Sequence, residues 1–191
     1  MPFTFSFPEV VDLVVMTAFL GFIFMDMFRR QAHMDIDPLL VSKPMFDWHA
    51  FWFACLVIAP GIVLHEIGHK IVALSFGQIA VFHAAYNFLI LGLILKLVNF
   101  PFIFFVPGYV SHMGSAGPLQ LSIIALAGPL VNFLLWGLAT IMLKQKKVKK
   151  KQLAFWLITQ KVNLFLFIFN MLPIPPFDGF TVFSGLYHAF F

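Results

Sequence analysis

The sequence has little charge for its length, and this scarcity excludes a water-soluble globular domain. Only 10% of the 191 residues are charged, whereas soluble domains carry about 25%. Hydrophobic residues make up 61% of the chain, and a soluble domain of this size has no interior large enough to bury so much apolar surface. We therefore expect an integral, multi-pass membrane protein in the lipid bilayer of the cell membrane.

Cysteine is almost absent. The single residue, Cys55, excludes an internal disulfide and a CxxC metal site, and its apolar neighbours indicate that it faces lipid or fills a core. The N-terminus also lacks the basic segment and the small-residue cleavage site of a signal peptide. Since the sequence shows no repeat, linker or long polar stretch, we expect a single membrane domain over residues 1–191.

Acidic residues are rare after the first quarter of the chain. Only Glu66 and Asp178 follow Asp47, and both lie in sequence that is apolar enough for membrane depth. Because a charge at that depth is costly, such a carboxylate indicates a functional site. Lysine is instead concentrated in KQKKVKKK at 144–151. This run has no interleaved aromatic residues and lies between two apolar segments, so it predicts a solvated loop and no nucleic-acid partner.

Long apolar runs predict an all-α polytopic fold with about five to six transmembrane helices. A spanning helix needs about 20 apolar residues, and suitable runs cover 10–28, 48–76, 119–143 and 153–172. A last apolar segment, 180–191, is too short to span.

The apolar run 84–110 is irregular because Pro101 and Pro107 interrupt it. We expect a helix there, followed by a short re-entrant β-strand or hairpin with FIFFV at 102–106 extended. SHMGSAGPLQ at 111–120 predicts a turn-rich loop. Irregular backbone is tolerated at membrane depth only where protein or a cavity satisfies its polar groups.

The second apolar run contains HEIGH at 65–69. Residues i and i+4 share one face of a helix, so His65 and His69 can bind the same metal ion. Glu66 lies beside them, where it can act as a general base. Zinc is the expected metal, because it takes imidazole and carboxylate ligands and keeps a position open in catalytic sites.

A third ligand must come from elsewhere in the chain. No glutamate follows Glu66, and the longer pattern HExxHxxGxxH is not present. The remaining candidates are Asp178, His83, His112 and His188. Asp178 is favoured because it is the only carboxylate among them and because PIPPFDG at 173–179 interrupts a helix, which allows its side chain to turn inward.

Estimated depths in the membrane indicate that HEIGH, Asn132 and Asp178 can belong to one site. His65 precedes Gly77 by about 18 Å along a helix, and Asn132 follows Leu119 by about 20 Å. If the two runs are antiparallel, HEIGH and Asn132 lie at similar depth. Asp178 follows the end of the 153–172 run, on the same side of the membrane.

Three motifs together resemble a known family. HEIGH in an apolar helix, AGPLVN at 127–132 and NMLPIPPFDG at 170–179 occur in this order. The combination resembles the site-2 protease family of intramembrane zinc metalloproteases, peptidase family M50. The resemblance implies a zinc metalloendopeptidase that cleaves membrane-spanning protein substrates; the oligomeric state stays open.

The resemblance also implies roles for six residues. The implied Zn²⁺ ligands are His65, His69 and Asp178; the implied catalytic base is Glu66; and the implied supports for substrate or oxyanion are Asn132 and Asn170.

Two indications of orientation oppose each other. The positive-inside rule places Arg29, Arg30, Lys43 and the lysine run on the cytoplasmic side, so the site would open toward the outside. Members of the family that the chain resembles generally have the site nearer the cytoplasm.

Other functions compete with proteolysis. A metal transporter could use the histidine–aspartate cluster as a transit site, although few intramembrane acids exist to form a path. A catalytically silent scaffold that binds membrane helices is a second alternative, which the intact HEIGH motif disfavours. A haem-binding bundle is a third, although histidines at i and i+4 suit a single ion better than the two faces of haem.

Overall fold

The computed structural model describes residues 5–29, 46–100, 106–145 and 148–191, and in this part of the chain four helices are long and apolar enough to cross a membrane. They are α1 (Phe7–Phe24), α3 (Trp48–Ser75), α5 (Pro118–Lys144) and α6 (Lys150–Asn170). Two shorter helices, α4 (Tyr86–Leu97) and α7 (Asp178–Phe190), and a two-stranded sheet accompany them. The predicted helical, polytopic membrane fold with a short β element is confirmed.

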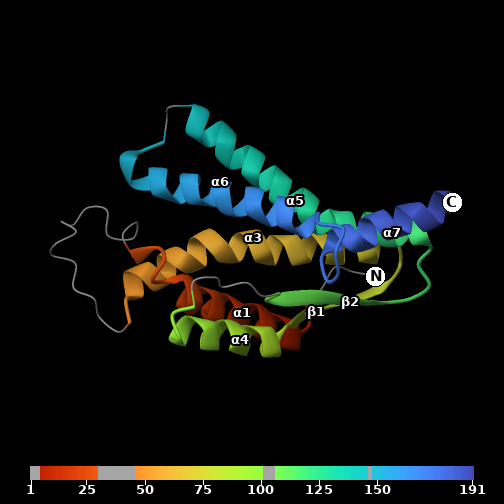
Figure 1. Cartoon of the computed structure of the whole chain (residues 1–191), viewed down its shortest axis with the longest axis horizontal. Coiled ribbons are helices and arrows are strands. Elements are labelled where there is room, and N and C mark those ends of the chain that lie inside the picture. Colours follow the sequence, from red (N-terminus) through yellow and green to blue (C-terminus); the bar gives the residue numbers. More distant parts are fainter. Residues whose placement is uncertain (1–4, 30–45, 101–105, 146–147) are drawn as a thin grey trace.

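Helix α3 lies at the centre of the molecule. It packs between α1 on one side and the α5–α6 hairpin on the other, while α4 packs on α1 (Figure 1). Half of its most apolar 18-residue stretch is buried inside the protein, which is the largest share among the four spans. Polar side chains on α3 can therefore face protein instead of lipid.

Capping side chains satisfy backbone N–H groups at the starts of α1 and α3. Ser6 and Glu9 form a capping box at α1, and Asp47 Oδ1 accepts a hydrogen bond from the Ala50 N–H at 3.0 Å at α3. The first N–H groups of a helix have no partner within it, so these residues determine where each helix begins.

Strands β1 (Ile79–Ala84) and β2 (Gly108–Met113) form an antiparallel pair, with Phe82 opposite Val110. The strand predicted at 102–106 lies largely outside the described residues. The predicted loop at 111–120 is wrong at its start, because residues 111–113 belong to β2. Strand β1 is not predicted from the sequence: its one buried face consists of Ala80, Phe82 and Ala84, but apolar neighbours hide that alternation in the sequence.

Two carboxylates of α1 attach it to β1. Glu9 Oε1 accepts a hydrogen bond from the Phe82 N–H at 2.8 Å, and Asp12 Oδ2 accepts one from the Ala84 N–H at 3.0 Å. Glu9 also forms an ion pair with Lys70 of α3, and both side chains are buried. The charge of Glu9 is buried because a lysine and a backbone N–H both compensate it.

Candidate metal centre

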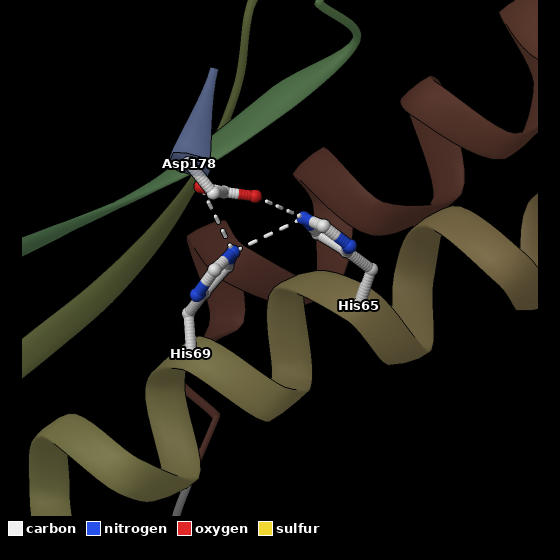
Figure 2. A group of neighbouring side chains, drawn as sticks. All are labelled: His65, His69 and Asp178. Atoms are coloured by element: carbon white, nitrogen blue, oxygen red, sulfur yellow. Dashed lines mark hydrogen bonds and ion pairs between the residues drawn. The ribbon is translucent and has the colours of Figure 1, made fainter. Parts of the chain in front are cut away.

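The histidines of HEIGH point from α3 toward one carboxylate, that of Asp178 (Figure 2). His65 Nε2 lies 3.1 Å from Asp178 Oδ2, and His69 Nε2 lies 3.4 Å from Asp178 Oδ1. The two Nε2 atoms are 3.0 Å apart. The i, i+4 spacing thus places both imidazoles on one helix face, as predicted, and α7 brings the third side chain to them.

Asp178 reaches this position because a helix begins there. Residues 171–177 form consecutive turns after α6, and Asp178 is the first residue of α7. The sequence placed Asp178 in an interrupting loop; the structure places it at the end of that loop, inside the first turn of the next helix. Helix α7 packs against α5, so the position of the carboxylate depends on helices other than α3.

The protonation of His69 follows from a backbone contact. Its Nδ1 lies 2.7 Å from the carbonyl oxygen of Ile124 in α5. A carbonyl oxygen can only accept, so Nδ1 carries the proton and donates it. In the neutral imidazole Nε2 is then the acceptor, and its lone pair points toward the other two side chains.

The ring nitrogen of His65 that carries the proton follows from the orientation of the Asn132 amide, which a backbone carbonyl determines. Asn132 Nδ2 donates to the carbonyl oxygen of Gly61 at 2.9 Å, so Oδ1 is the Asn132 atom that faces His65, at 2.7 Å from Nδ1. His65 Nδ1 must therefore donate, which leaves its Nε2 unprotonated as well. Asn132 is fully buried, and its contact with His65 agrees with the predicted similar depth of HEIGH and Asn132.

Gly128 provides the space for the two imidazoles. A Cβ at this position of α5 would lie 2.6 Å from His65 Nε2 and would also collide with His69. No side chain larger than glycine therefore fits there without moving the histidines. Gly128 of AGPLVN therefore lets α5 pack closely against the metal centre.

These residues fit a zinc ion. Three ligand atoms, one each from His65, His69 and Asp178, all lie within 4.8 Å of one another. Zinc–ligand bonds of about 2.0–2.1 Å in a tetrahedron separate ligand atoms by about 3.3 Å, and the separations here are 3.0, 3.1 and 3.4 Å. Two neutral imidazoles with free Nε2 atoms and one carboxylate are a typical catalytic zinc set, which leaves a fourth position open.

Glu66 adjoins the cluster without being a member of it. The residue is only 7% exposed, and its carboxylate accepts no hydrogen bond from the described residues. A buried carboxylate normally has a hydrogen-bonded partner. Its oxygens are therefore available to a proton donor that enters the site.

Other predicted residues lie outside the cluster. His83, on β1, contacts Ser111 Oγ of β2 at 3.0 Å, and His112 and His188 are exposed; the described residues place none of them with the ligand atoms. Asn170 is the last residue of α6 and half-buried. The structure brings it into no hydrogen bond with the described side chains of the site.

Sequence reasoning missed Asn163. This residue of α6 is 1% exposed, and its Oδ1 accepts a hydrogen bond from Asn132 Nδ2 at 3.0 Å. An amide side chain inside the apolar run 153–172 was a usable signal, since a buried amide needs partners. The partner itself comes from another helix, so the sequence alone does not identify it.

Comparisons with known proteins agree with the motifs. The model of peptidase family M50 matches residues 137–191. A protein of Methanocaldococcus jannaschii named "Putative zinc metalloprotease MJ0611" is 37% identical over 180 residues, which cover 93% of this chain and 84% of that protein. No solved structure matches the chain.

Proposed function

The chain belongs to peptidase family M50, and on that premise we propose that it is an intramembrane zinc metalloprotease that hydrolyses peptide bonds of membrane-spanning protein substrates. The observation that carries the proposal is the convergence of His65, His69 and Asp178 on one point. The first two belong to a helix long enough to span the membrane.

The residues of the site divide the work of peptide hydrolysis. His65, His69 and Asp178 would hold a Zn²⁺ ion, which would supply the Lewis acidity that polarises a carbonyl and acidifies water. Glu66 takes the proton of the attacking water and passes it to the leaving amine. The hydrogen bonds to Ile124 and Asn132 keep the Nε2 lone pairs of the two imidazoles available to such an ion.

The sheet supports the proposal that the substrate binds in an extended conformation. A substrate helix uses its carbonyl groups in its own hydrogen bonds, so it must unwind before hydrolysis. An unwound segment can add as a strand to an open sheet edge. In the described residues β1 is the only strand that pairs with β2, so the other edge of β2 has no partner strand.

The ladder shows which backbone groups face that edge. The N–H groups of Phe82 and Ala84 point to α1 and not to β2. In an antiparallel pair, residues opposite each other direct their backbone groups alike, either toward the ladder or away from it. The backbone N–H groups of Val110 and Gly108, which lie opposite Phe82 and Ala84, therefore also point away from the ladder. Since α1 carboxylates occupy the outer edge of β1, the substrate strand would pair with the Val110 side of β2.

The first experiment measures metal content and cleavage together. We expect about one zinc per chain in detergent-purified protein, from the single tetrahedral set of ligands, and loss of both zinc and activity in His65→Ala and Asp178→Ala. Retention of zinc by the Asp178 variant would remove this residue from the ligand set. Zinc binding without cleavage of any transmembrane substrate would favour a transporter or a scaffold.

Glu66→Gln separates chemistry from metal binding. The amide cannot take a proton, so cleavage should fall by about 10²–10⁴-fold, the contribution of a general acid–base group, while zinc content stays unchanged. The measurement is turnover of a fluorogenic transmembrane peptide in proteoliposomes, beside metal analysis of the same samples. Turnover at the normal rate would contradict the role given to Glu66.

A further inference from the structure

We infer that Asn163 is a positioning residue of the metal centre, which acts through Asn132 to hold His65 in its metal-binding tautomer. The inference rests on the proposed function and deepens it. Asn163 lies on α6, which contributes none of the three ligands. Its hydrogen bonds in the described residues go to Asn132 and to the Thr159 carbonyl oxygen, not to a ligand side chain, so its effect must pass through another side chain.

The evidence is a chain of hydrogen bonds across three helices. His65 Nδ1 donates to Asn132 Oδ1 at 2.7 Å, and Asn132 Nδ2 donates to Asn163 Oδ1 at 3.0 Å. Asn163 Nδ2 donates in turn to the carbonyl oxygen of Thr159, at 2.8 Å. The chain therefore runs from α3 through α5 to the backbone of α6.

The direction of every bond in this chain is determined by backbone carbonyls. The NH₂ group of the Asn163 side chain must face the Thr159 carbonyl oxygen, because a carbonyl oxygen only accepts hydrogen bonds. Its Oδ1 is thereby turned toward Asn132, where it can meet only a donor. Asn132 has two amide hydrogens, and the Gly61 carbonyl and Asn163 accept one each. The Oδ1 atom of Asn132 must therefore be the atom that accepts the hydrogen bond from His65 Nδ1.

Burial makes this arrangement costly to disturb. Asn132 is 0% and Asn163 1% exposed, so water cannot replace a missing partner. An unsatisfied buried donor costs about 1–3 kcal/mol. Without Asn163, one hydrogen of the Asn132 amide has no acceptor, and the reversed amide orientation, which would offer a donor to His65 Nδ1, becomes less unfavourable.

The backbone is shaped to admit Asn163. Gly61 lies on α3, one turn before His65, and a Cβ at Gly61 would lie 3.0 Å from Asn163 Oδ1. That distance is tighter than an ordinary van der Waals contact, so the neighbour would have to shift. Glycine at this position lets the amide of α6 come close to α3, beside the turn that carries the first ligand.

Gln160 provides a matched comparison on the same helix. Its Nε2 donates to Thr140 Oγ1 of α5 at 2.7 Å, and Thr140 donates to the Trp136 carbonyl at 2.8 Å. This bond also joins the amide of an α6 side chain to α5, but the hydrogen bonds that continue from it end at the Trp136 carbonyl and not at a metal ligand. A purely structural role for such bonds would make the two residues equivalent.

The test measures zinc affinity by competition with a chromophoric chelator, and thermal unfolding of the zinc-free protein, for full-length protein in detergent. Loss of a residue that orients a metal ligand typically costs about 10–100-fold in affinity. We expect Asn163→Leu to weaken zinc binding by about 10-fold, at the lower end because the Gly61 contact of Asn132 remains. Gln160→Leu should lower the melting temperature comparably and leave the zinc Kd unchanged.

A double variant shows whether the effect passes through Asn132. Asn132→Leu removes the partner of His65 directly and should weaken zinc binding more than Asn163→Leu. Adding Asn163→Leu to Asn132→Leu should then cause no further loss, because residues that act through one another are not additive. Independent, multiplying losses would overturn the inference, as would an Asn163→Leu Kd equal to that of Gln160→Leu.

Separate controls distinguish a folding defect and a general absence of zinc from the expected loss of zinc affinity. If Asn163→Leu does not fold, Asn163→Ser, whose side chain is too short to reach Asn132, carries the same expectation. Absence of zinc from the unsubstituted protein would overturn the proposed function together with this inference. Normal zinc in the unsubstituted protein with unchanged affinity in both Asn163 variants would overturn only the inference.

Discussion

The two sides of α3 bury their polar groups in different ways. Toward α5 and α6, neutral amides form a directed chain from His65 through Asn132 to Asn163. Toward α1 and the sheet, charged groups dominate, with Glu9 contacting both Lys70 and the backbone of β1. An amide distinguishes donor from acceptor and so can select a histidine tautomer, whereas an ion pair mainly holds two elements together.

This difference assigns separate tasks to the two sides. The amide side prepares the ligands for the metal, since the hydrogen bonds there reach a ring nitrogen of each histidine and have their direction determined by backbone carbonyls. The charged side joins α1, α3 and β1 and thereby places the sheet beside the helix that carries HEIGH. Substitutions on the two sides should therefore change different measured quantities.

The largest expected effect on the charged side comes from breaking the buried ion pair. Lys70→Met leaves Glu9 as a buried charge without its lysine, which typically costs about 3–5 kcal/mol. The free energy of unfolding in detergent should fall by this amount. The double variant Glu9→Gln/Lys70→Met should recover part of it, because no uncompensated charge remains. A loss of zinc affinity without a loss of stability would contradict the division of tasks.

An intermediate effect is expected at the open edge of β2. Val110→Pro removes one outward N–H, and a single hydrogen bond of about 0.5–1.5 kcal/mol corresponds to a decrease in kcat/KM of about 2–10-fold. The zinc Kd should not change. Val110→Ala, which keeps the N–H, is the control for the lost side chain. Equal kinetics for the proline and alanine variants would exclude substrate pairing at Val110.

The smallest effect is expected at the far end of the α5–α6 hairpin. Lys150 is exposed at the start of α6, so Lys150→Cys in a Cys55→Ala background should leave activity unchanged. By the positive-inside rule, a membrane-impermeant maleimide should label this cysteine only from the cytoplasmic side. Labelling only from the opposite side would place the end of the molecule that carries the sheet and α7 toward the cytoplasm.

The sequence by itself determined the features that depend on local spacing. Apolar runs of sufficient length predicted the four spans, since lipid requires every backbone group to be satisfied within a helix. The spacing within HEIGH placed His65 and His69 on one face, because 3.6 residues complete a helical turn. The scarcity of carboxylates left Asp178 as the best third candidate. None of these inferences needed a contact between distant segments.

Only the tertiary structure decided which distant residues meet. Strand β1 exists because β2 and two carboxylates of α1 satisfy its backbone. The chain between Ala84 and Gly108 hides that pairing from any local pattern. Lys70 could be recognised as costly but not assigned to Glu9, and Asn163 could not be linked to His65. A buried polar group needs a partner, but the sequence does not say which one, because helix packing and not spacing along the chain brings the partners together.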